Sequence, residues 1–274
     1  MDFPFKIERE DIISLVKKAG DEILEIYENQ SGLRTYKKRD SSPVTEADFL
    51  SQKIILKGLK KYGWKILSEE TEDDLSRLGE DKIWIVDPLD GTREFLDKKG
   101  EFSVMVGLVV RGEPVLGVVY KPCGGKIYFA EKGKGAYLKE NGKDPVKLEV
   151  SSTSSLSEAH LLVTRSHFDG LEKKFVQNCR PKKVTPMGSI GVKLGQIAEG
   201  KADCYVTLSN KTSEWDICAP EIILKEAGGK VTDLKGENFV YNRKEVKNLN
   251  GIVASNGKIH NQLLSSGRKI LGEF

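Results

Sequence analysis

The chain has 274 residues, 38% of them hydrophobic and 31% charged, which is typical of a soluble globular protein with one or two domains. Its 44 basic and 41 acidic residues nearly balance, so we expect no nucleic-acid partner, and no apolar run approaches the length that spans a membrane. The start of the chain does not resemble a signal peptide and the four cysteines form no CxxC pair, so we expect a cytoplasmic protein in a reducing compartment.

The N-terminal part of the chain predicts two helices joined by a polar loop. Apolar residues recur at helical spacing over residues 8–29, which predicts a long amphipathic helix. Residues 37–43 form the polar loop, and a second helix is expected to begin at Thr45. Asp48 lies in the first turn of that helix, where the helix dipole alone could explain a negative charge.

Two strands are predicted next, and each runs into acidic residues. A short strand from Trp64 leads into Glu69–Glu70, a pair that usually belongs to a solvated loop. A buried strand is predicted over residues 83–86, where apolar residues follow one another. We expect this strand to end at Asp87, because Pro88 has no N–H and holds the residue before it in extended geometry.

Two carboxylates and a hydroxyl are crowded after this second strand. Asp90 follows Asp87 by three positions, and Gly91 lets the backbone turn tightly before a short helix through Phe95, with Thr92 as its expected N-cap. Carboxylates this close repel each other unless a proton or a cation intervenes, and the free N–H groups of a helix start suit a phosphate oxygen. The pattern indicates Mg²⁺ and a phosphate ester, although Asp-Pro-x-Asp-Gly is also common turn chemistry.

The rest of the chain divides into a β-rich part and a part where strands and helices alternate. Turns punctuate three β-rich runs, which predict an antiparallel meander over residues 102–110, 115–120 and 126–130. We place a domain boundary at the serine-rich run 151–157, which gives domains of residues 1–150 and 151–274. In the second domain, strands are predicted at 161–164, 202–206 and 230–233, and helices at 190–198 and 219–227.

The string Asp87–Thr92 (DPLDGT) resembles the signature of the Mg²⁺-dependent, lithium-sensitive phosphatase superfamily. That superfamily includes inositol monophosphatases, fructose-1,6-bisphosphatases and 3'(2'),5'-bisphosphate nucleotidases. The resemblance extends through four motifs over roughly residues 10–255. It implies a layered αβαβα sugar-phosphatase fold of mixed α+β class. The metal-binding half, residues 1–150, would hold a mixed, largely antiparallel sheet, and residues 151–274 would form a smaller α/β substrate-binding half.

The resemblance also implies a site that holds two to three Mg²⁺ ions. Its ligands would be Glu69, Asp87, the carbonyl of Leu89, Asp90 and Asp216. Glu69 matches the first glutamate of a Gly-Glu-Glu motif, although Ser68 replaces the glycine. Asp216 matches the aspartate of a Trp-Asp motif, but taken alone it equally fits a helix N-cap.

Two further residues match a catalytic pair. Asp48 lies in a Val-Thr-Glu-Ala-Asp segment whose aspartate pairs, in the superfamily, with the threonine of the central motif, here Thr92. The implied reaction is in-line attack of water on a phosphate monoester, with Thr92 and Asp48 taking part in removal of its proton. No phosphoenzyme is implied.

Within the superfamily, the second half of the chain is similar to 3'(2'),5'-bisphosphate nucleotidases. The implied substrate contacts are Gly91, Thr92, Thr164, Arg165, Ser166, His167, Ser189 and Lys193. Without the resemblance, His167 would be an ordinary surface or core histidine and Lys193 a solvated charge. Inositol monophosphatases carry a glutamate where this chain has Ser209, which argues against inositol phosphate as the preferred substrate.

We therefore expect a Mg²⁺-dependent enzyme that hydrolyses 3'-phosphoadenosine 5'-phosphate to AMP and phosphate, as a monomer or homodimer. A broad inositol monophosphatase or fructose-1,6-bisphosphatase is the alternative within the same chemistry. From another class, a regulatory binding protein that has lost catalysis is an alternative, but the complete set of acidic ligands argues against it.

Overall fold

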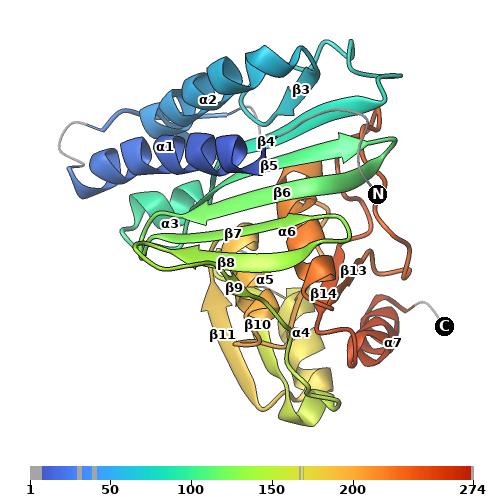
Figure 1. Cartoon of the computed structure of the whole chain (residues 1–274). Coiled ribbons are helices and arrows are strands. Elements are labelled where there is room, and N and C mark those ends of the chain that lie inside the picture. Colours follow the sequence, from blue (N-terminus) through green and yellow to red (C-terminus); the bar gives the residue numbers. More distant parts are fainter. Residues whose placement is uncertain (1–7, 30–32, 39–41, 167, 169, 273–274) are drawn as a thin grey trace.

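The computed structural model describes residues 8–29, 33–38, 42–166, 168 and 170–272. These residues form five layers, which follow one another from top to bottom in Figure 1: two helices, a seven-stranded sheet, two helices, a five-stranded sheet, and two outer helices. Three clusters of buried apolar side chains hold the layers together. The αβαβα layering that the resemblance implies is therefore confirmed.

The seven-stranded sheet carries its strands in chain order. β3 (Lys65–Ser68) and β4 (Lys82–Asp90) pair in parallel, and every later pair of neighbours is antiparallel. The sheet is thus mixed and largely antiparallel, as predicted. The later strands are β5 (Ser103–Val110), β6 (Glu113–Lys121), β7 (Lys126–Glu131), β8 (Gly135–Glu140) and β9 (Val146–Lys147).

The outer face of this sheet is covered by α1 (Arg9–Glu28) and α2 (Glu46–Leu59), which lie close to the ranges predicted for them. Val16 of α1 and Ile55 of α2 are fully buried in a cluster that also contains Trp84 of β4. The ends of the predicted polar loop, Lys37 and Pro43, belong to two short paired strands, and residues 39–41 of that loop lie outside the described residues. A 3₁₀ turn continues the second helix. These elements are β1 (Thr35–Lys37), β2 (Pro43–Thr45) and η1 (Lys60–Tyr62).

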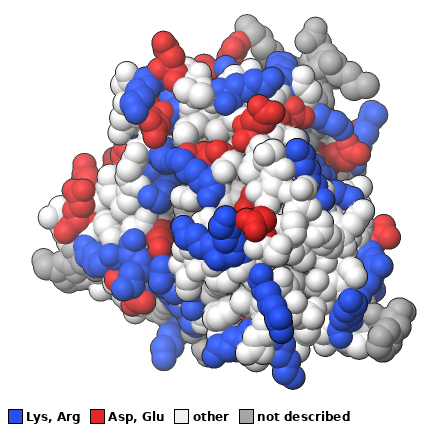
Figure 2. All heavy atoms as spheres, turned by 90° about the horizontal axis from the view of Figure 1, so that it is seen from below, with Lys and Arg blue, Asp and Glu red and all other residues white. Residues whose placement is uncertain are grey.

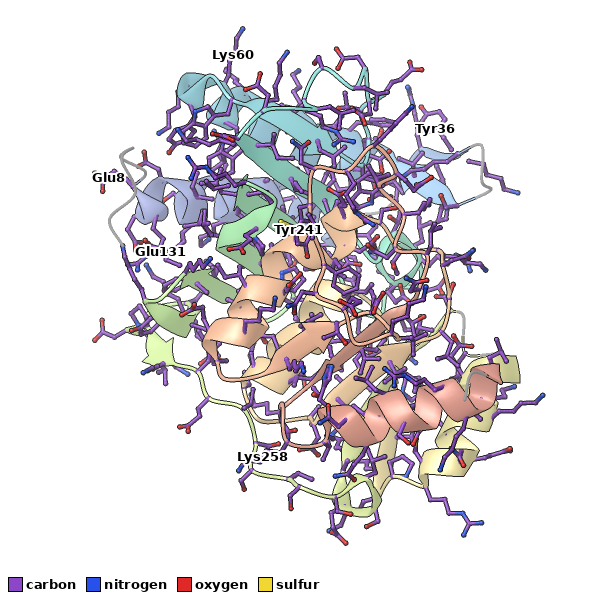
Figure 3. All side chains as sticks on the ribbon, turned by 90° about the vertical axis from the view of Figure 1, so that its right-hand side faces the viewer. Glu8, Tyr36, Lys60, Glu131, Tyr241 and Lys258 are labelled. Atoms are coloured by element: carbon purple, nitrogen blue, oxygen red, sulfur yellow. The ribbon has the colours of Figure 1, made fainter. Side chains whose placement is uncertain are left out.

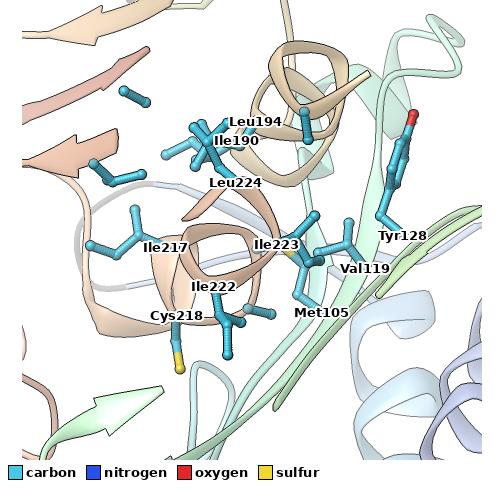
Figure 4. Close-up of a cluster of buried hydrophobic side chains, with 14 of the residues drawn as sticks. Met105, Val119, Tyr128, Ile190, Leu194, Ile217, Cys218, Ile222, Ile223 and Leu224 are labelled. Atoms are coloured by element: carbon cyan, nitrogen blue, oxygen red, sulfur yellow. The ribbon is translucent and has the colours of Figure 1, made fainter. Parts of the chain in front are cut away.

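The inner face packs on α5 (Ile190–Ala198) and α6 (Glu214–Glu226), and Figure 4 shows their apolar side chains meeting those of the sheet. The helix α6 approaches the sheet very closely, because a Cβ atom at Gly107 would lie 2.5 Å from the Cys218 sulfur and one at Gly117 2.4 Å from the Ala219 carbonyl oxygen. Larger residues at either glycine would push the helix off the sheet. Tyr241 lies against α6 in the middle of the molecule (Figure 3).

The second sheet has five strands in the order β11-β10-β12-β14-β13. The first three are parallel and the last two pairings are antiparallel. Two helices, α4 (Gly170–Cys179) and α7 (His260–Leu271), cover its outer face. The strands are β10 (His160–Thr164), β11 (Lys183–Met187), β12 (Cys204–Thr207), β13 (Lys230–Thr232) and β14 (Ile252–Ser255), and a 3₁₀ turn, η2 (Leu156–Glu158), precedes them.

Two expectations around the central motif are wrong. The strand β4 does not end at Asp87 but continues to Asp90, because a bulge accommodates the proline. Thr92 is not the N-cap of the short helix α3 (Thr92–Leu96), since Gly91 occupies that position with a φ of +93°. A side chain at Gly91 would meet the backbone oxygen of Glu101, so only glycine fits there.

Other boundaries shift or were not predicted. The helix expected from residue 219 begins already at Glu214, because a capping box formed by Ser213 and Asp216 starts it. The helix at 190–198 is confirmed, whereas α4, β11, β14 and α7 were not predicted. The division into domains at residues 150 and 151 stays a prediction, because α5 and α6 pack on both sheets and share one core with them.

No helix in the described part of the chain is long and apolar enough to cross a membrane. The face seen in Figure 2 carries basic side chains at many points with acidic ones between them, as the nearly balanced charge leads one to expect.

Candidate active site

Three aspartates, the buried Asp87 and Asp90 and the partly buried Asp216, meet between the seven-stranded sheet and the start of α6. One carboxylate oxygen from each lies within 4.8 Å of the others. The first two come from the end of β4, and the third comes from the first turn of α6, 126 positions beyond Asp90 by residue number. The structure thus brings together three of the four acidic residues that the resemblance implies as metal ligands.

A bulge in β4 places two of these carboxylates side by side. Asp87 pairs with Met105 of the neighbouring strand and Asp90 pairs with Ser103, so β4 contains one residue more than β5 over this stretch. Pro88 lies inside the bulge, where its missing N–H costs no ladder hydrogen bond. The Leu89 N–H donates to Asp87 Oδ1 over 3.0 Å, which fixes that carboxylate at the strand end.

The third aspartate is fixed by the cap of its own helix. The Ser213 N–H donates to Asp216 Oδ2 over 2.6 Å, as part of the capping box that starts α6. Asp216 is therefore both a capping residue and a member of the acidic cluster, so the two interpretations of this residue hold together.

Asp90 is tied to the start of α5. Its Oδ2 accepts hydrogen bonds from the Ser189 hydroxyl (2.6 Å) and from the Gly191 N–H (2.8 Å). Ser189 also caps α5 through Val192 N–H and holds a φ of +55°, which is uncommon for a residue other than glycine. Such strain is retained where the surroundings fix it, and here it aims one hydroxyl at both the helix and the acidic cluster.

The electrostatics of the three aspartates call for a cation. Burial raises the pKa of Asp87 well above its ordinary value, and the negative charges of Glu69, Asp90 and Asp216 add to that rise. Burial, with the charges of Glu69 and Asp90, likewise raises the pKa of Asp216 to about 8. Grouped carboxylates of this kind are stabilised in the charged form by a hard cation, and an all-oxygen donor set suits Mg²⁺.

The fourth acidic residue lies beside the cluster and has a basic partner. The Glu69 N–H donates to the Val86 carbonyl over 3.2 Å, which places Glu69 next to the end of β4. Its carboxylate Oε1 accepts a hydrogen bond from Lys38 Nζ over 2.6 Å, and Lys38 also pairs with Glu70. Glu69 is not among the three residues whose oxygens meet. The contact with Lys38, which lies between β1 and β2, was not predicted from the sequence.

Asp48 and Thr92 are in contact. The Thr92 hydroxyl lies 3.2 Å from Asp48 Oδ1 and 3.2 Å from the Leu89 carbonyl oxygen. The other oxygen of Asp48, Oδ2, accepts from the N–H (2.7 Å) and the hydroxyl (2.6 Å) of Thr45. Burial raises the pKa of Asp48 to about 6 in spite of these hydrogen bonds.

A cavity of about 220 Å³ opens beside these residues. Six of the eight residues predicted to contact substrate line it. Gly91, Thr92, Thr164, Ser166, Ser189 and Lys193 line the cavity. His167 lies outside the described residues. Arg165 is absent from the lining residues described, because its guanidinium pairs with both carboxylate oxygens of Glu101 (3.0 and 2.7 Å) and with the Pro186 carbonyl.

The cavity is also lined by residues that were not singled out from the sequence. They are Arg93, Glu94, Tyr205, Thr207, Lys211 and Thr212. Glu94 is buried and its Oε1 accepts a hydrogen bond from the Ser166 hydroxyl over 2.8 Å. The only signal for the loop that contains Lys211 was its position between a predicted strand and the Trp-Asp motif.

The fold and this acidic, hydroxyl-lined cavity define a class of protein: the chain belongs to the inositol monophosphatase family, whose model matches residues 8–271. It is similar to the 3'(2'),5'-bisphosphate nucleotidase CysQ of Salmonella typhimurium, with 35% identity over 239 residues that cover 86% of this chain and 94% of that protein. The nucleotidase CysQ of Buchnera aphidicola is 36% identical, over 84% of this chain and 86% of that protein.

Solved structures show the same likeness. The CysQ structure from Bacteroides thetaiotaomicron is 31% identical, covers 93% of this chain and 99% of that chain, and superposes with a TM-score of 0.79. An IMPase structure from Thermotoga maritima is 29% identical, covers 97% of this chain and 99% of that chain, and has a TM-score of 0.82.

Proposed function

We propose that this chain is a Mg²⁺-dependent 3'(2'),5'-bisphosphate nucleotidase that hydrolyses 3'-phosphoadenosine 5'-phosphate to AMP and phosphate. The observation that carries the proposal is the cluster of three aspartates, two of which line the cavity, in a chain that shares about a third of its residues with nucleotidases named CysQ over most of its length. The alternative, an inositol monophosphatase or fructose-1,6-bisphosphatase, is supported at the level of the broader family.

The donor atoms fit Mg²⁺. Asp87, Asp90 and Asp216 would hold it with their carboxylates, and Glu69 would join them once its pairing with Lys38 yields to the cation. Bound Mg²⁺ supplies charge neutralisation and Lewis acidity for phosphoryl transfer, which needs positioning and neutralisation rather than covalent catalysis.

Proton removal from the attacking water falls to Thr92 and Asp48. Because Thr45 occupies Oδ2 of Asp48, only Oδ1 remains for the Thr92 hydroxyl. The threonine hydroxyl can accept the proton of water while passing its own to Asp48. As the new bond from water oxygen to phosphorus forms, the bond from phosphorus to the ribose oxygen breaks, and that oxygen leaves with a proton from solvent.

The cavity walls would orient the substrate. The N–H groups of Gly91 and Thr92, which line the cavity at the start of α3, would contact oxygens of the reacting phosphate. Thr164, Ser166 and Ser189 offer hydroxyls along the wall formed by the second sheet and α5. In this proposal residues 1–150 supply most of the metal ligands, with Asp216 as the exception, and residues 151–274 supply most of the substrate contacts, with Gly91 and Thr92 as the exceptions.

A substrate panel tests the proposal. Phosphate release is measured for 3'-phosphoadenosine 5'-phosphate, inositol 1-phosphate and fructose 1,6-bisphosphate, each with Mg²⁺ and with EDTA. We expect the nucleotide to have the highest kcat/KM and EDTA to abolish turnover of all three. A preference for either sugar phosphate would assign the chain to another branch of its family.

A further inference from the structure

The substrate of the proposed reaction carries a second phosphate that must be held but not cleaved, and the cavity shows which cation is available for it. Three cationic residues lie among the described residues that line the cavity: Arg93, Lys193 and Lys211. Arg165, which the sequence suggested for this role, is already neutralised by its two hydrogen bonds to Glu101.

Lys193 is occupied by the protein itself. It is 2% exposed, its Nζ donates to the Met187 carbonyl over 3.1 Å, and it lies 4.8 Å from the centre of the Tyr205 ring. Burial lowers its pKa, while the negative charges of Asp90 and Glu94 favour its charged form. Its charge therefore compensates the acidic residues around it, and its ammonium group has one hydrogen-bond partner inside the protein already.

Arg93 follows Thr92 directly in α3, so its backbone lies at the reacting end of the cavity, beside the Thr92–Asp48 pair. Lys211 lines the cavity from a different element, the loop between β12 and α6. Its side chain is exposed, and no carboxylate within the described ranges forms an ion pair with it. Lys211 thus offers the cavity an ammonium group free of ion pairs, from an element that does not carry Thr92, and a non-reacting phosphate requires such a group.

The backbone that presents Lys211 is well held. The Lys211 N–H donates to the Ser209 hydroxyl, and the Ser209 N–H donates to Thr207 Oγ1, each over 3.2 Å. The next residue, Thr212, accepts the Asn248 N–H over 2.8 Å. The backbone of this loop is thus fixed relative to the Ser213–Asp216 cap, and the lysine side chain extends from that fixed backbone.

From these contacts we infer that Lys211 binds the non-reacting phosphate of the substrate and so sets the preference for a bisphosphate over a monophosphate. The inference rests on the proposed function. An ion-paired contact with phosphate is specific to substrates that carry that second group, whereas the acidic cluster and Thr92 serve every phosphate monoester.

The test compares two substrates that differ only in the second phosphate, 3'-phosphoadenosine 5'-phosphate and adenosine 3'-phosphate. In Lys211→Ala, kcat/KM for the bisphosphate should fall about ten- to a hundredfold, mainly through KM, with little change for the monophosphate. Lys211→Arg should restore most of the loss, and Lys174→Ala, at an exposed lysine on α4, should change neither substrate. The product AMP retains only the non-reacting phosphate. Its affinity, measured by calorimetry, should fall in Lys211→Ala, recover in Lys211→Arg and stay unchanged in Lys174→Ala.

Equal losses on the two substrates, or no loss on either, would overturn the role of Lys211 while leaving the nucleotidase activity in place. A selective loss of the bisphosphate in Arg165→Ala with none in Lys211→Ala would return the role to Arg165. If the wild-type protein fails to hydrolyse the bisphosphate at all, the proposed function falls, and this inference falls with it.

Discussion

Thr92 and Asp48 are joined by one hydrogen bond of 3.2 Å, although 44 positions separate them in the chain. Asp48 belongs to the first turn of α2 and Thr92 to the first turn of α3, so the bond links an outer helix to the end of the central strand. The remaining oxygen of Asp48 is held by Thr45, and this leaves the carboxylate a single orientation.

Because the two residues act on one proton, we predict strongly non-additive losses. Thr92→Ala and Asp48→Asn should each lower kcat by about a hundredfold or more, a typical range for acid–base catalysis, and the double variant should be hardly worse than either. Mg²⁺ affinity, measured by calorimetry, should change little. Additive losses of kcat across the double-mutant cycle would show that Thr92 and Asp48 do not act on the same proton.

The three clustered aspartates predict an unusual pH dependence for the metal-free protein. The folded-state pKa of Asp216 is about 8, whereas an unfolded aspartate titrates near 3.9, so the folded state binds the extra proton between these values. Stability contributed by the protonated form is therefore lost as pH rises from about 4 to 8. In EDTA, the melting temperature should fall between pH 6 and pH 8.5.

Asp216→Asn should flatten that fall, because asparagine needs no proton to stay neutral. Mg²⁺ should raise the melting temperature of the wild-type protein by several degrees at pH 8.5 and less at pH 6, since at pH 6 it must displace protons. The same variant should abolish turnover. A melting temperature in EDTA that does not depend on pH would show that the folded protein does not raise the pKa of Asp216.

Lys38 predicts a further effect on metal affinity. Its ammonium group contacts Glu69 and Glu70, so it neutralises negative charge that would otherwise attract a metal ion. Burial raises the pKa of Glu70 to about 7. Lys38→Met should therefore tighten Mg²⁺ binding about three- to tenfold, because a competing cation is gone and the site becomes more negative. Isothermal titration measures it, with Lys37→Met as the matched control. Weaker binding in Lys38→Met would mean that this lysine orders Glu69 for the metal.

Much of this site could be predicted from the sequence because several of its residues lie close together in the chain. Asp87, Asp90 and Thr92 lie within six residues, and the strand–turn–helix that holds them follows from the apolar run, the proline and the glycine. The resemblance supplied the distant partners Asp48 and Asp216. The bulge at Pro88 was not predicted, because it depends on the register with β5, which no local pattern fixes.

Contacts between polar side chains that lie far apart in the chain could not be predicted from the sequence. Arg165 has the right chemistry for a phosphate, but Glu101, 64 positions away, accepts two of its three hydrogen bonds and the Pro186 carbonyl accepts the third. Lys38 follows β1 and Glu69 follows β3, so the two residues meet only once the chain has folded. Such pairings depend on tertiary packing, and the same residue types in the same order could have been solvated.

His260 provides a last prediction, on the stability of the second sheet. Its side chain is buried, with Nε2 2.9 Å from Thr232 Oγ1 and Nδ1 2.9 Å from the Ser255 hydroxyl. Because the Thr232 hydroxyl donates to the Asp233 carbonyl, Thr232 must accept from Nε2–H, and Ser255 then donates to Nδ1. A second ring proton on Nδ1 would break this arrangement, because the Ser255 hydroxyl would have to turn from donor to acceptor. Burial, with the nearby charge of Lys230, lowers the pKa of His260 to about 4.

The unfolded chain, with an ordinary histidine pKa near 6.5, therefore binds more protons than the folded protein between about pH 4 and 6.5. The contribution of His260 to stability is complete above pH 6.5 and is lost as pH falls towards 4, up to about 3 kcal/mol. Urea unfolding of the wild type and His260→Asn should show a difference in unfolding free energy that shrinks over this range. Parallel curves for His260→Asn and the wild type would mean that His260 accepts a proton in the folded protein as readily as in the unfolded chain.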